Sequence, residues 1–386
     1  MNFELNDDQK TLRDTLRKFA KSELNGDVIQ RDRDQFFDRD LWRKMGEMAI
    51  PGLPVPSEYG GGGLSPLDTA IALEALGQGC TDGGLLFSLC AHMLPCTMPI
   101  YKFGTEEQRR KWLPGLCDGT LIAGNAMTEP GTGSDAFNMT TRAVRDGDDW
   151  VLNGNKIFIT NAPVADVFVL FALTDPEKGY HGGVSCFIVP AESRGLSRSH
   201  KIEKMGIRTS PFGEVALEDV RVPHSAMLAG EGGGSSLFTH SMDWERSLLF
   251  AFHVGAMERL IETCVKYART RQQFGSPITK FPAIREHMAE MRCRVEASRL
   301  LVYQAASRLE KSRSVSQDAA IAKLVVSESL GEVTRRAVQI HGGYGFTVEY
   351  EVERALRDAV GATLYSGTNE MMRNIIASWM GLGAGT

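Results

Sequence analysis

The stretch Asp243-Trp244-Glu245-Arg246 opens a long helical pattern in the last third of the chain, and the rest of the sequence is interpreted from it. Counting from Glu245, the residues four, seven and eleven positions later are Leu249, Phe252 and Ala256. This spacing places the carboxylate of Glu245 on the apolar face of its helix. The positions three and four residues away carry no Lys or Arg to pair with it.

A carboxylate in this place has two interpretations. Burial without a cation raises its pKa, and a raised pKa lets a carboxylate act as a general base near neutral pH. Alternatively, Glu245 is a structural residue near a helix start, where the helix dipole favours a negative charge. Structural carboxylates outnumber catalytic ones, so the choice between these two interpretations of Glu245 depends on the other stretches of the chain.

Size and composition indicate a globular protein of two or three domains. The chain has 386 residues, 42% of them hydrophobic and 24% charged. A formal net charge of −5 with scattered basic residues argues against nucleic-acid binding. The seven cysteines form no CxxC pair and no Cys/His metal spacing, which predicts a reducing cytoplasm and no metal site.

The start of the chain lacks the basic and then apolar pattern of a signal peptide. The longest uncharged stretch, 83–101, contains His92, Pro95 and Pro99. Prolines break a helix, so we expect a buried, broken helix here and no membrane span.

The order of patterns along the chain predicts an α+β fold that is mostly helical. Residues 1–120 have helical spacing, 121–230 form a β domain and 231–386 form a helical bundle. In the β domain, Asn153-Gly154 between two apolar runs predicts a hairpin turn, and strands are expected over 167–173, 184–190, 214–217 and 220–223. The long C-terminal helices are expected over 236–271, 282–310, 315–341 and 366–380.

A second informative stretch is Met127-Thr128-Glu129-Pro130-Gly131-Thr132-Gly133-Ser134-Asp135. Its glycines permit close backbone approach to a ligand, and Thr128 and Ser134 offer hydroxyls. Thr160, after the predicted hairpin strand, offers a third hydroxyl. The competing interpretations are a simple turn between strands and an ordinary strand-surface threonine.

Taken together, eight stretches in this order resemble the acyl-CoA dehydrogenase flavoprotein family over nearly the whole chain. They are Tyr59-Gly60-Gly61, Phe103-Gly104-Thr105-Glu106-Glu107-Gln108, 127–135, Lys156-Ile157-Phe158-Ile159-Thr160-Asn161, Glu218-Asp219-Val220-Arg221-Val222-Pro223, Arg271-Gln272-Gln273-Phe274-Gly275, Gln339-Ile340-His341-Gly342-Gly343-Tyr344-Gly345 and Tyr365-Ser366-Gly367-Thr368-Asn369-Glu370. The resemblance implies a family fold with an N-terminal helical domain, a middle β domain and a C-terminal four-helix bundle.

The resemblance also implies FAD as the cofactor. Residues expected at the flavin are Met127, Thr128, Gly133, Ser134, Phe158 and Thr160, with Phe158 where the family usually has Trp. Residues expected to reach the FAD of a neighbouring subunit are Arg271, Phe274, Gln339, Gly342 and Gly343, and Thr368 and Glu370 would hold the cofactor from the last helix. A homotetramer follows from the family only.

One departure from the family pattern concerns the catalytic base. Most members carry a glutamate directly after the tyrosine, and this chain has Ser366 there. A minority, including isovaleryl-CoA dehydrogenase, carry the base in an Asp-x-Glu-Arg pattern, which matches Glu245. We therefore expect Glu245 to be the base and Ser366 to contribute only its backbone N–H. Substrate contacts are expected from Asp243, Arg246, Tyr365 and Gly367.

The implied reaction is removal of the α-proton by Glu245 and transfer of the β-hydrogen as hydride to flavin N5. Some stretches, such as Phe87-Ser88-Leu89-Cys90-Ala91-His92, are similar to dehydrogenases of prolyl groups on a peptidyl carrier protein. The substrate is thus expected to be a carrier-bound aminoacyl thioester or an acyl-CoA, with a branched-chain acyl-CoA dehydrogenase as the alternative. The electron acceptor would be electron-transfer flavoprotein or oxygen. A flavin monooxygenase of the same fold and a non-catalytic helical interaction protein are the hypotheses from other classes.

Overall fold

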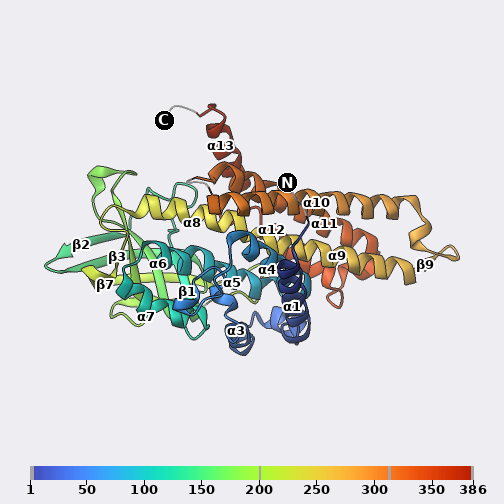
Figure 1. Ribbon diagram of the computed structural model, residues 1–386, viewed down its shortest axis with the longest axis horizontal. Coiled ribbons are helices and arrows are strands. Elements are labelled where there is room, and N and C mark those ends of the chain that lie inside the picture. The colour runs from blue at the N-terminus through green and yellow to red at the C-terminus, as the bar shows by residue number, and fades with distance from the viewer. Residues whose placement is uncertain (1–3, 200, 312–313, 384–386) are drawn as a thin grey trace.

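The structure is a computed structural model that describes residues 4–199, 201–311 and 314–383. Figure 1 shows a β domain at one end of the long axis, N-terminal helices beneath the centre, and long C-terminal helices that run to the other end. The prediction of a mostly helical α+β fold in three parts is confirmed.

The N-terminal part is helical because its sequence supplies the starts of the helices. Asn6 and Gln9 form a capping box at the first helix, Ser65 caps the helix that begins at Pro66, and Thr105 and Gln108 form a second capping box. The helices are α1 (Asp7–Glu23), α2 (Val28–Asp34), α3 (Arg39–Gly46), α4 (Pro66–Gly79), α5 (Gly83–His92), α6 (Met98–Phe103) and α7 (Glu106–Cys117), with short helical turns at Ile50–Gly52 and Ser57–Tyr59.

The apolar stretch beginning at Gly83 is a broken helix inside the protein. A π-helical turn, Met93–Thr97, separates α5 from α6 around Pro95. Among the described residues, Gly83–Phe103 is the one helical segment long and apolar enough to cross a membrane, and 89% of its window is buried inside the protein. A buried core helix and a membrane span can both have this length and apolar composition.

The β domain is an eight-stranded sheet in the order β6-β7-β3-β2-β4-β5-β8, with β1 beside β4. The strands are β1 (Ala123–Ala126), β2 (Arg142–Asp146), β3 (Asp149–Thr160), β4 (Val167–Leu173), β5 (Val184–Pro190), β6 (Leu196–Arg198), β7 (Phe212–Pro223) and β8 (Met227–Leu228). Alternate residues of β4 pack into two separate cores, one on each face. This double burial explains the continuous apolar run over 167–173.

The hairpin predicted at Asn153-Gly154 is wrong. Both residues lie inside the continuous strand β3, at a β-bulge opposite β7. A Cβ on Gly154 would lie 2.4 Å from Thr141 Oγ1, so the bulge needs glycine for close packing. The true hairpin joins β2 to β3 through Gly147, which has φ +65°.

The C-terminal helices are α8 (Gly234–Leu248), α9 (Phe250–Thr270), α10 (Pro282–Lys311), α11 (Ser316–His341), α12 (Glu351–Gly361) and α13 (Asn369–Trp379). The predicted helix 236–271 is divided between α8 and α9 at Leu249, which keeps helical dihedral angles of φ −53° and ψ −43°. The sequence did not predict α12, and α13 begins three residues later than expected, at Asn369. A two-stranded hairpin, β9 (Gln272–Gln273) and β10 (Ser276–Pro277), joins α9 to α10 at the far end of the long axis (Figure 1).

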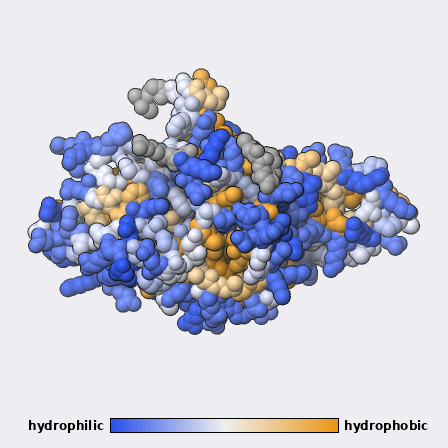
Figure 2. All heavy atoms as spheres, viewed as in Figure 1, coloured by the Kyte–Doolittle hydropathy of each residue, from blue (hydrophilic) through white to orange (hydrophobic). Residues whose placement is uncertain are grey.

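Short 3-10 turns complete the chain at Ala162–Val164, Pro176–Lys178, His224–Ala226, Ile278–Lys280 and Gly342–Phe346. Helix α13 projects away from the body of the molecule (Figure 1). Figure 2 shows hydrophobic residues gathered at the tip of this projection, where Met380 and Leu382 are 64% and 69% exposed.

Candidate functional site

One large cavity lies where the β domain meets α5, α8 and the segment that precedes α13. Its volume is about 1140 Å³, slightly above the roughly 300–1,000 Å³ usual for ligand pockets. It is lined by most residues that the sequence singled out, namely Met127, Thr128, Gly133, Ser134, Phe158, Thr160, Asp243, Glu245, Arg246, Tyr365, Ser366, Gly367 and Thr368. The fold therefore brings the two informative stretches, 127–135 and 243–246, to one place.

Glu245 extends from α8 into this cavity. Its carboxylate accepts a hydrogen bond from the hydroxyl of Ser366, 121 residues further along the chain. Burial raises the pKa of Glu245, while Ser366 and the neighbouring Arg246 oppose that rise. The carboxylate thus has the raised pKa of a general base, as its helical position predicted.

The sequence assigned Ser366 a role for its backbone N–H only, and the structure corrects this. The hydroxyl of Ser366 bonds to Glu245, and its carbonyl accepts a hydrogen bond from Arg246 Nε at 2.9 Å. Its backbone N–H makes no hydrogen bond to any residue in the described part of the chain. That N–H is therefore available to a ligand, and the side chain has a partner that the sequence did not reveal.

The segment containing Ser366 and Gly367 has an unusual backbone. Ser366 has φ +58° and Gly367 has φ +87°. A Cβ on Gly367 would lie 2.9 Å from Met372 Cε and 3.2 Å from Arg246 Nη2, so no larger residue fits without displacing them. The hydroxyl of the preceding Tyr365 is hydrogen-bonded to His253 on α9.

Asp243 lies two residues before Glu245 on α8 and also lines the cavity. It accepts a hydrogen bond of 2.7 Å from Ser316 at the start of α11. Burial raises the pKa of Asp243, and the bond from Ser316 opposes that effect. Its carboxylate is thus tied to the start of α11, whereas that of Glu245 is tied to the segment that precedes α13.

The loop 127–135 is held by a buried ion pair. Lys156 Nζ lies 2.9 Å from Glu129 Oε1, and the two side chains are 0% and 2% exposed. Glu129 also accepts hydrogen bonds from the backbone N–H groups of Thr140 and Thr141. Burial alone would raise the pKa of Glu129, but Lys156 and these bonds hold it at about 2. The pair fixes the path of the loop beside the cavity.

The hydroxyls of Thr128, Ser134 and Thr160 face the same cavity and have no hydrogen-bond partner among the residues that the structure describes. Near them, Phe158 is 55% exposed and lies parallel to Phe212, with ring centroids 5.6 Å apart and an interplanar angle of 10°. Unpaired hydroxyls beside an exposed aromatic ring suit a flat ring system with a polar edge. These residues therefore fit the isoalloxazine ring of FAD.

Sequence reasoning missed the apolar end of the cavity. Phe87, Ala91 and Pro95 line it from α5 and the π-helical turn. The rings of Phe87 and Tyr365 have centroids 4.5 Å apart. The helical spacing of four residues between Phe87, Ala91 and Pro95 was a signal that could have placed them on one face.

The remaining predicted cofactor residues lie elsewhere. Arg271, Phe274, Gly342 and Gly343 line a second cavity of about 700 Å³ beside the β9–β10 hairpin. Gln339 is exposed and lines neither cavity, and Glu370 is exposed and lies 3.8 Å from Arg373. Figure 1 places the hairpin and the β domain at opposite ends of the long axis. One chain therefore does not bring the two predicted FAD sets together.

Phe274 at the tip of this hairpin is 96% exposed. It has φ +49° and the following Gly275 has φ +72°, the backbone of a tight two-residue hairpin turn. The guanidinium of Arg271 lies 5.5 Å from the centre of the Tyr344 ring. A phenylalanine exposed in this way is suited to contact with another molecule.

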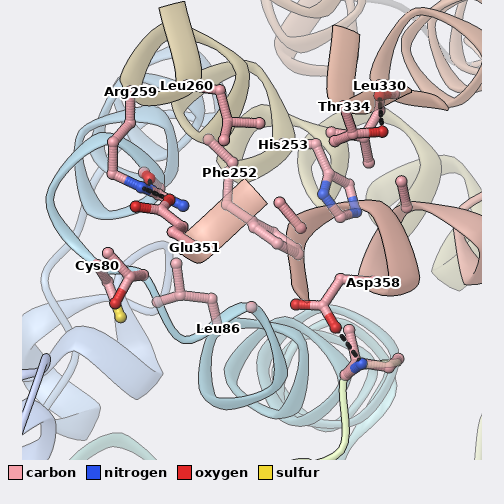
Figure 3. A pocket seen from close by; sticks show the side chains of 17 residues that line it. Cys80, Leu86, Phe252, His253, Arg259, Leu260, Leu330, Thr334, Glu351 and Asp358 are labelled. Atoms are coloured by element: carbon pink, nitrogen blue, oxygen red, sulfur yellow. Dashed lines mark hydrogen bonds and ion pairs between the residues drawn. The ribbon is translucent and has the colours of Figure 1, made fainter. Parts of the chain in front are cut away.

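A small cavity of about 30 Å³ (Figure 3) shares the lining residues Ile207 and Asp358 with the large cavity, and it has room for about one or two water molecules. In Figure 3 the carboxylate of Asp358 on α12 points to the backbone N–H of Ile207, from which it accepts a hydrogen bond. Burial raises the pKa of Asp358 to about 7. His253 lines the same small cavity and is hydrogen-bonded to the hydroxyl of Tyr365. Residues of the small cavity therefore contact residues that line the large one.

Across residues 4–199, 201–311 and 314–383, no three His, Cys, Asp or Glu side chains come together in a way that could hold a metal ion.

Comparison with known families gives matches over nearly the whole chain. The N-terminal domain of acyl-CoA dehydrogenases matches residues 6–120, the middle domain matches residues 124–220, and the C-terminal domain matches residues 232–381.

Individual relatives are similar over their full length. An L-prolyl-(peptidyl-carrier protein) dehydrogenase of Pseudomonas fluorescens is 41% identical over 98% of this chain and 99% of the relative. A short-chain specific acyl-CoA dehydrogenase of Clostridium acetobutylicum is 38% identical over 98% of this chain and 99% of the relative.

Two solved structures are similarly close. The prolyl acyl carrier protein oxidase AnaB has a TM-score of 0.96 and 42% identity, covering 98% of this chain and 100% of that one. The FAD complex of PigA has a TM-score of 0.96 and 38% identity, covering 99% and 100% of the two chains.

Proposed function

The chain belongs to the acyl-CoA dehydrogenase family, and we propose that it catalyses FAD-dependent α,β-dehydrogenation of an acyl thioester. One observation carries the proposal. The Glu245 carboxylate, with its pKa raised by burial, lines the same cavity as three hydroxyls that have no partner among the described residues. A flavin monooxygenase would not need this carboxylate. A helical interaction protein would need neither the carboxylate nor the three hydroxyls.

Thr128, Ser134, Thr160 and Phe158 would hold the flavin ring in the cavity, since they supply hydroxyls and a flat apolar surface there. Met127, Gly133 and Thr368 line the same region. FAD supplies, when bound, the acceptor for the hydride that leaves the β-carbon of the substrate.

The chain's own residues would do the proton chemistry. Glu245 is placed to take the α-proton of the thioester. The free backbone N–H of Ser366 is a donor for the thioester carbonyl, whose oxygen gains negative charge as the proton leaves. The cavity between the β domain and α8 keeps these groups partly out of water, which strengthens both interactions.

For the substrate, we propose an aminoacyl group, such as prolyl, on a peptidyl carrier protein. The similarity to prolyl carrier enzymes supports this, and the similarity to a short-chain acyl-CoA enzyme of comparable identity supports acyl-CoA as the alternative. Glu245 in the Asp-x-Glu-Arg position is also what a branched-chain, isovaleryl-like acyl-CoA dehydrogenase would carry.

The substrate class is tested by giving the holoenzyme prolyl-loaded carrier protein, or isovaleryl-CoA or butyryl-CoA, and weighing the thioester by mass spectrometry. A carrier-bound product lighter by two hydrogen atoms, with the CoA esters unchanged, is the expected result. Conversion of the CoA esters alone would assign the chain to the acyl-CoA enzymes. The same assay with and without oxygen or an electron-transfer flavoprotein identifies the acceptor.

The second FAD region supports an assembly in which one copy completes the site of another. We propose that Arg271 and Phe274 reach the FAD of a neighbouring copy in a homotetramer, because they line the second cavity beside the β9–β10 hairpin, and this hairpin lies at the opposite end of the long axis from the β domain (Figure 1). The exposed apolar tip of α13 supports further contacts between copies (Figure 2). All seven cysteines are free and six are buried, which supports a reducing compartment such as the cytoplasm.

Replacing Arg271 by alanine is expected to weaken FAD binding by roughly tenfold or more, because a charge-assisted contact to the cofactor's phosphates is lost. The measurement is the FAD retained after gel filtration, read from the flavin absorbance. Arg269→Ala, two residues earlier at the exposed end of α9, is the matched control. Equal FAD retention in the two variants would contradict the role of Arg271.

A further inference from the structure

Glu245 and Ser366 meet in the cavity from two separate elements. Ser366 Oγ donates a hydrogen bond to Glu245 Oε1, and both residues line the cavity proposed for FAD and substrate. An ionised carboxylate only accepts hydrogen bonds, so the hydroxyl is the donor. Among the described residues, this is the one side-chain hydrogen bond that the Glu245 carboxylate receives.

The protein fixes the direction of the Ser366 hydroxyl. Ser366 has φ +58°, a left-handed conformation that a residue with a side chain adopts only when its surroundings impose it. Arg246 Nε holds the Ser366 carbonyl at 2.9 Å. Three residues further on, Asn369 Oδ1 accepts hydrogen bonds from Lys323 Nζ at 2.6 Å and Ser327 Oγ at 3.0 Å. The segment is therefore anchored at Ser366 itself and at Asn369, and the hydrogen bond between Tyr365 and His253 anchors the residue before Ser366.

Besides Ser366, the Arg246 cation also lowers the pKa of Glu245, and the other titratable groups nearby are hydrogen-bonded elsewhere or neutral. On α8, Asp243 accepts from Ser316, and Arg246 Nε is used by the Ser366 carbonyl. The remaining titratable groups that face Glu245 are Cys90 and Cys96 from α5 and the turn after it, and Tyr365. Burial raises the pKa of each of these three well above its ordinary value, so none of them carries charge near neutral pH.

We propose that Ser366 is the positioning residue of the base, its hydroxyl holding the Glu245 carboxylate in the cavity and stabilising its anionic form. The inference rests on the proposed function, since it concerns the same reaction. Ser366 occupies the position directly after the tyrosine, where the family pattern usually has the catalytic glutamate itself. In this chain the position supports a base that comes from α8.

The consequence for pH dependence has a definite sign. A hydrogen bond donated to a carboxylate favours the ionised form and lowers the pKa, whereas burial raises it. Without the hydroxyl, the effect of burial is less opposed, so the pKa of Glu245 rises. Because the base acts only when ionised, the rising limb of the pH–rate profile moves to higher pH.

The test compares Ser366→Ala with Ser366→Gly in the holoenzyme. Both variants lack the hydroxyl, but only glycine is comfortable at positive φ, so the pair separates the hydroxyl from backbone strain. We expect both to keep FAD, and both to shift the rising limb for anaerobic flavin reduction upward by about one pH unit. Below the shifted limb the rate falls about tenfold, and it recovers as the pH is raised.

Two results would overturn the proposal. One is a wild-type pH profile in both variants. The other is a shift in Ser366→Ala with a wild-type profile in Ser366→Gly, which would assign the effect to the backbone.

Glu245→Gln, measured in parallel, separates this proposal from the proposed function. If Glu245→Gln still reduces the flavin at the wild-type rate, the assignment of the base fails, and Ser366 has no base to position. If Glu245→Gln is inactive while both Ser366 variants keep the wild-type profile, only the positioning role fails.

Discussion

Replacing Glu245 by glutamine is expected to slow flavin reduction by substrate by roughly 10²- to 10⁴-fold, the usual contribution of a general base. Glutamine has nearly the same shape as glutamate, and its side-chain oxygen can still accept the hydrogen bond from Ser366. It cannot take the α-proton. Fold and cofactor should therefore be kept while the chemical step is lost, as measured by stopped-flow absorbance of the flavin under anaerobic conditions.

Glu262→Gln is the matched control for this prediction. Glu262 is exposed on α9, where its carboxylate accepts a hydrogen bond of 2.8 Å from Gln78 Nε2, and it does not line the cavity. The same chemical change there should leave the rate within about twofold of wild type, because surface substitutions have small effects. Wild-type reduction by Glu245→Gln would exclude Glu245 as the base.

Replacing Lys156 by methionine is expected to lower the free energy of unfolding by about 3–5 kcal/mol and to abolish FAD retention. The change leaves the Glu129 carboxylate buried without its cation, since both side chains are almost fully enclosed. Glu129 organises the loop 127–135, so the hydroxyls of Thr128 and Ser134 lose their fixed places. Urea unfolding of the protein and flavin absorbance after gel filtration measure the two effects.

Two comparisons check that the buried pair is the cause. Lys156→Met combined with Glu129→Gln should be more stable than Lys156→Met alone, because no uncompensated charge remains. The second comparison is the free energy of unfolding of the unmodified protein at different pH values. The pKa of Glu129 is lowered from an ordinary value of 4.5 to about 2, so the stabilising contribution of Glu129 is complete above pH 4.5 and is lost as the pH falls to about 2. A double variant no more stable than Lys156→Met would contradict this account.

Local patterns in the sequence predicted most of the fold. Capping residues such as Asn6 and Thr105 marked helix starts, because their side chains satisfy backbone N–H groups only a few residues away. The runs 167–173 and 184–190 gave β4 and β5, because both faces of these strands are buried. The helical position of Glu245 correctly predicted the raised pKa of its carboxylate.

The errors arose where distant residues decide the structure. Asn153-Gly154 predicts a turn locally, but its partners are on β7: Asn153 and Asp219 form two hydrogen bonds across the bulge. The Ser366 hydroxyl was missed because its partner lies 121 residues away in the sequence. No local pattern contains either contact. The FAD contacts expected at the β9–β10 hairpin rest on the family resemblance alone, since within one chain this hairpin lies at the opposite end of the long axis from the β domain (Figure 1).

The most direct test of the central claim is the visible flavin spectrum of the purified holoenzyme under anaerobic conditions, recorded as acyl thioesters are added. We expect the oxidised flavin band to bleach with a thioester that carries hydrogens on both the α- and β-carbons. We expect the band to persist with the corresponding free acid, because an ionised carboxylate leaves the α-proton much less acidic than a thioester does. A yellow protein that no thioester bleaches, whether on CoA or on a carrier protein, would contradict the assignment as an acyl-thioester dehydrogenase.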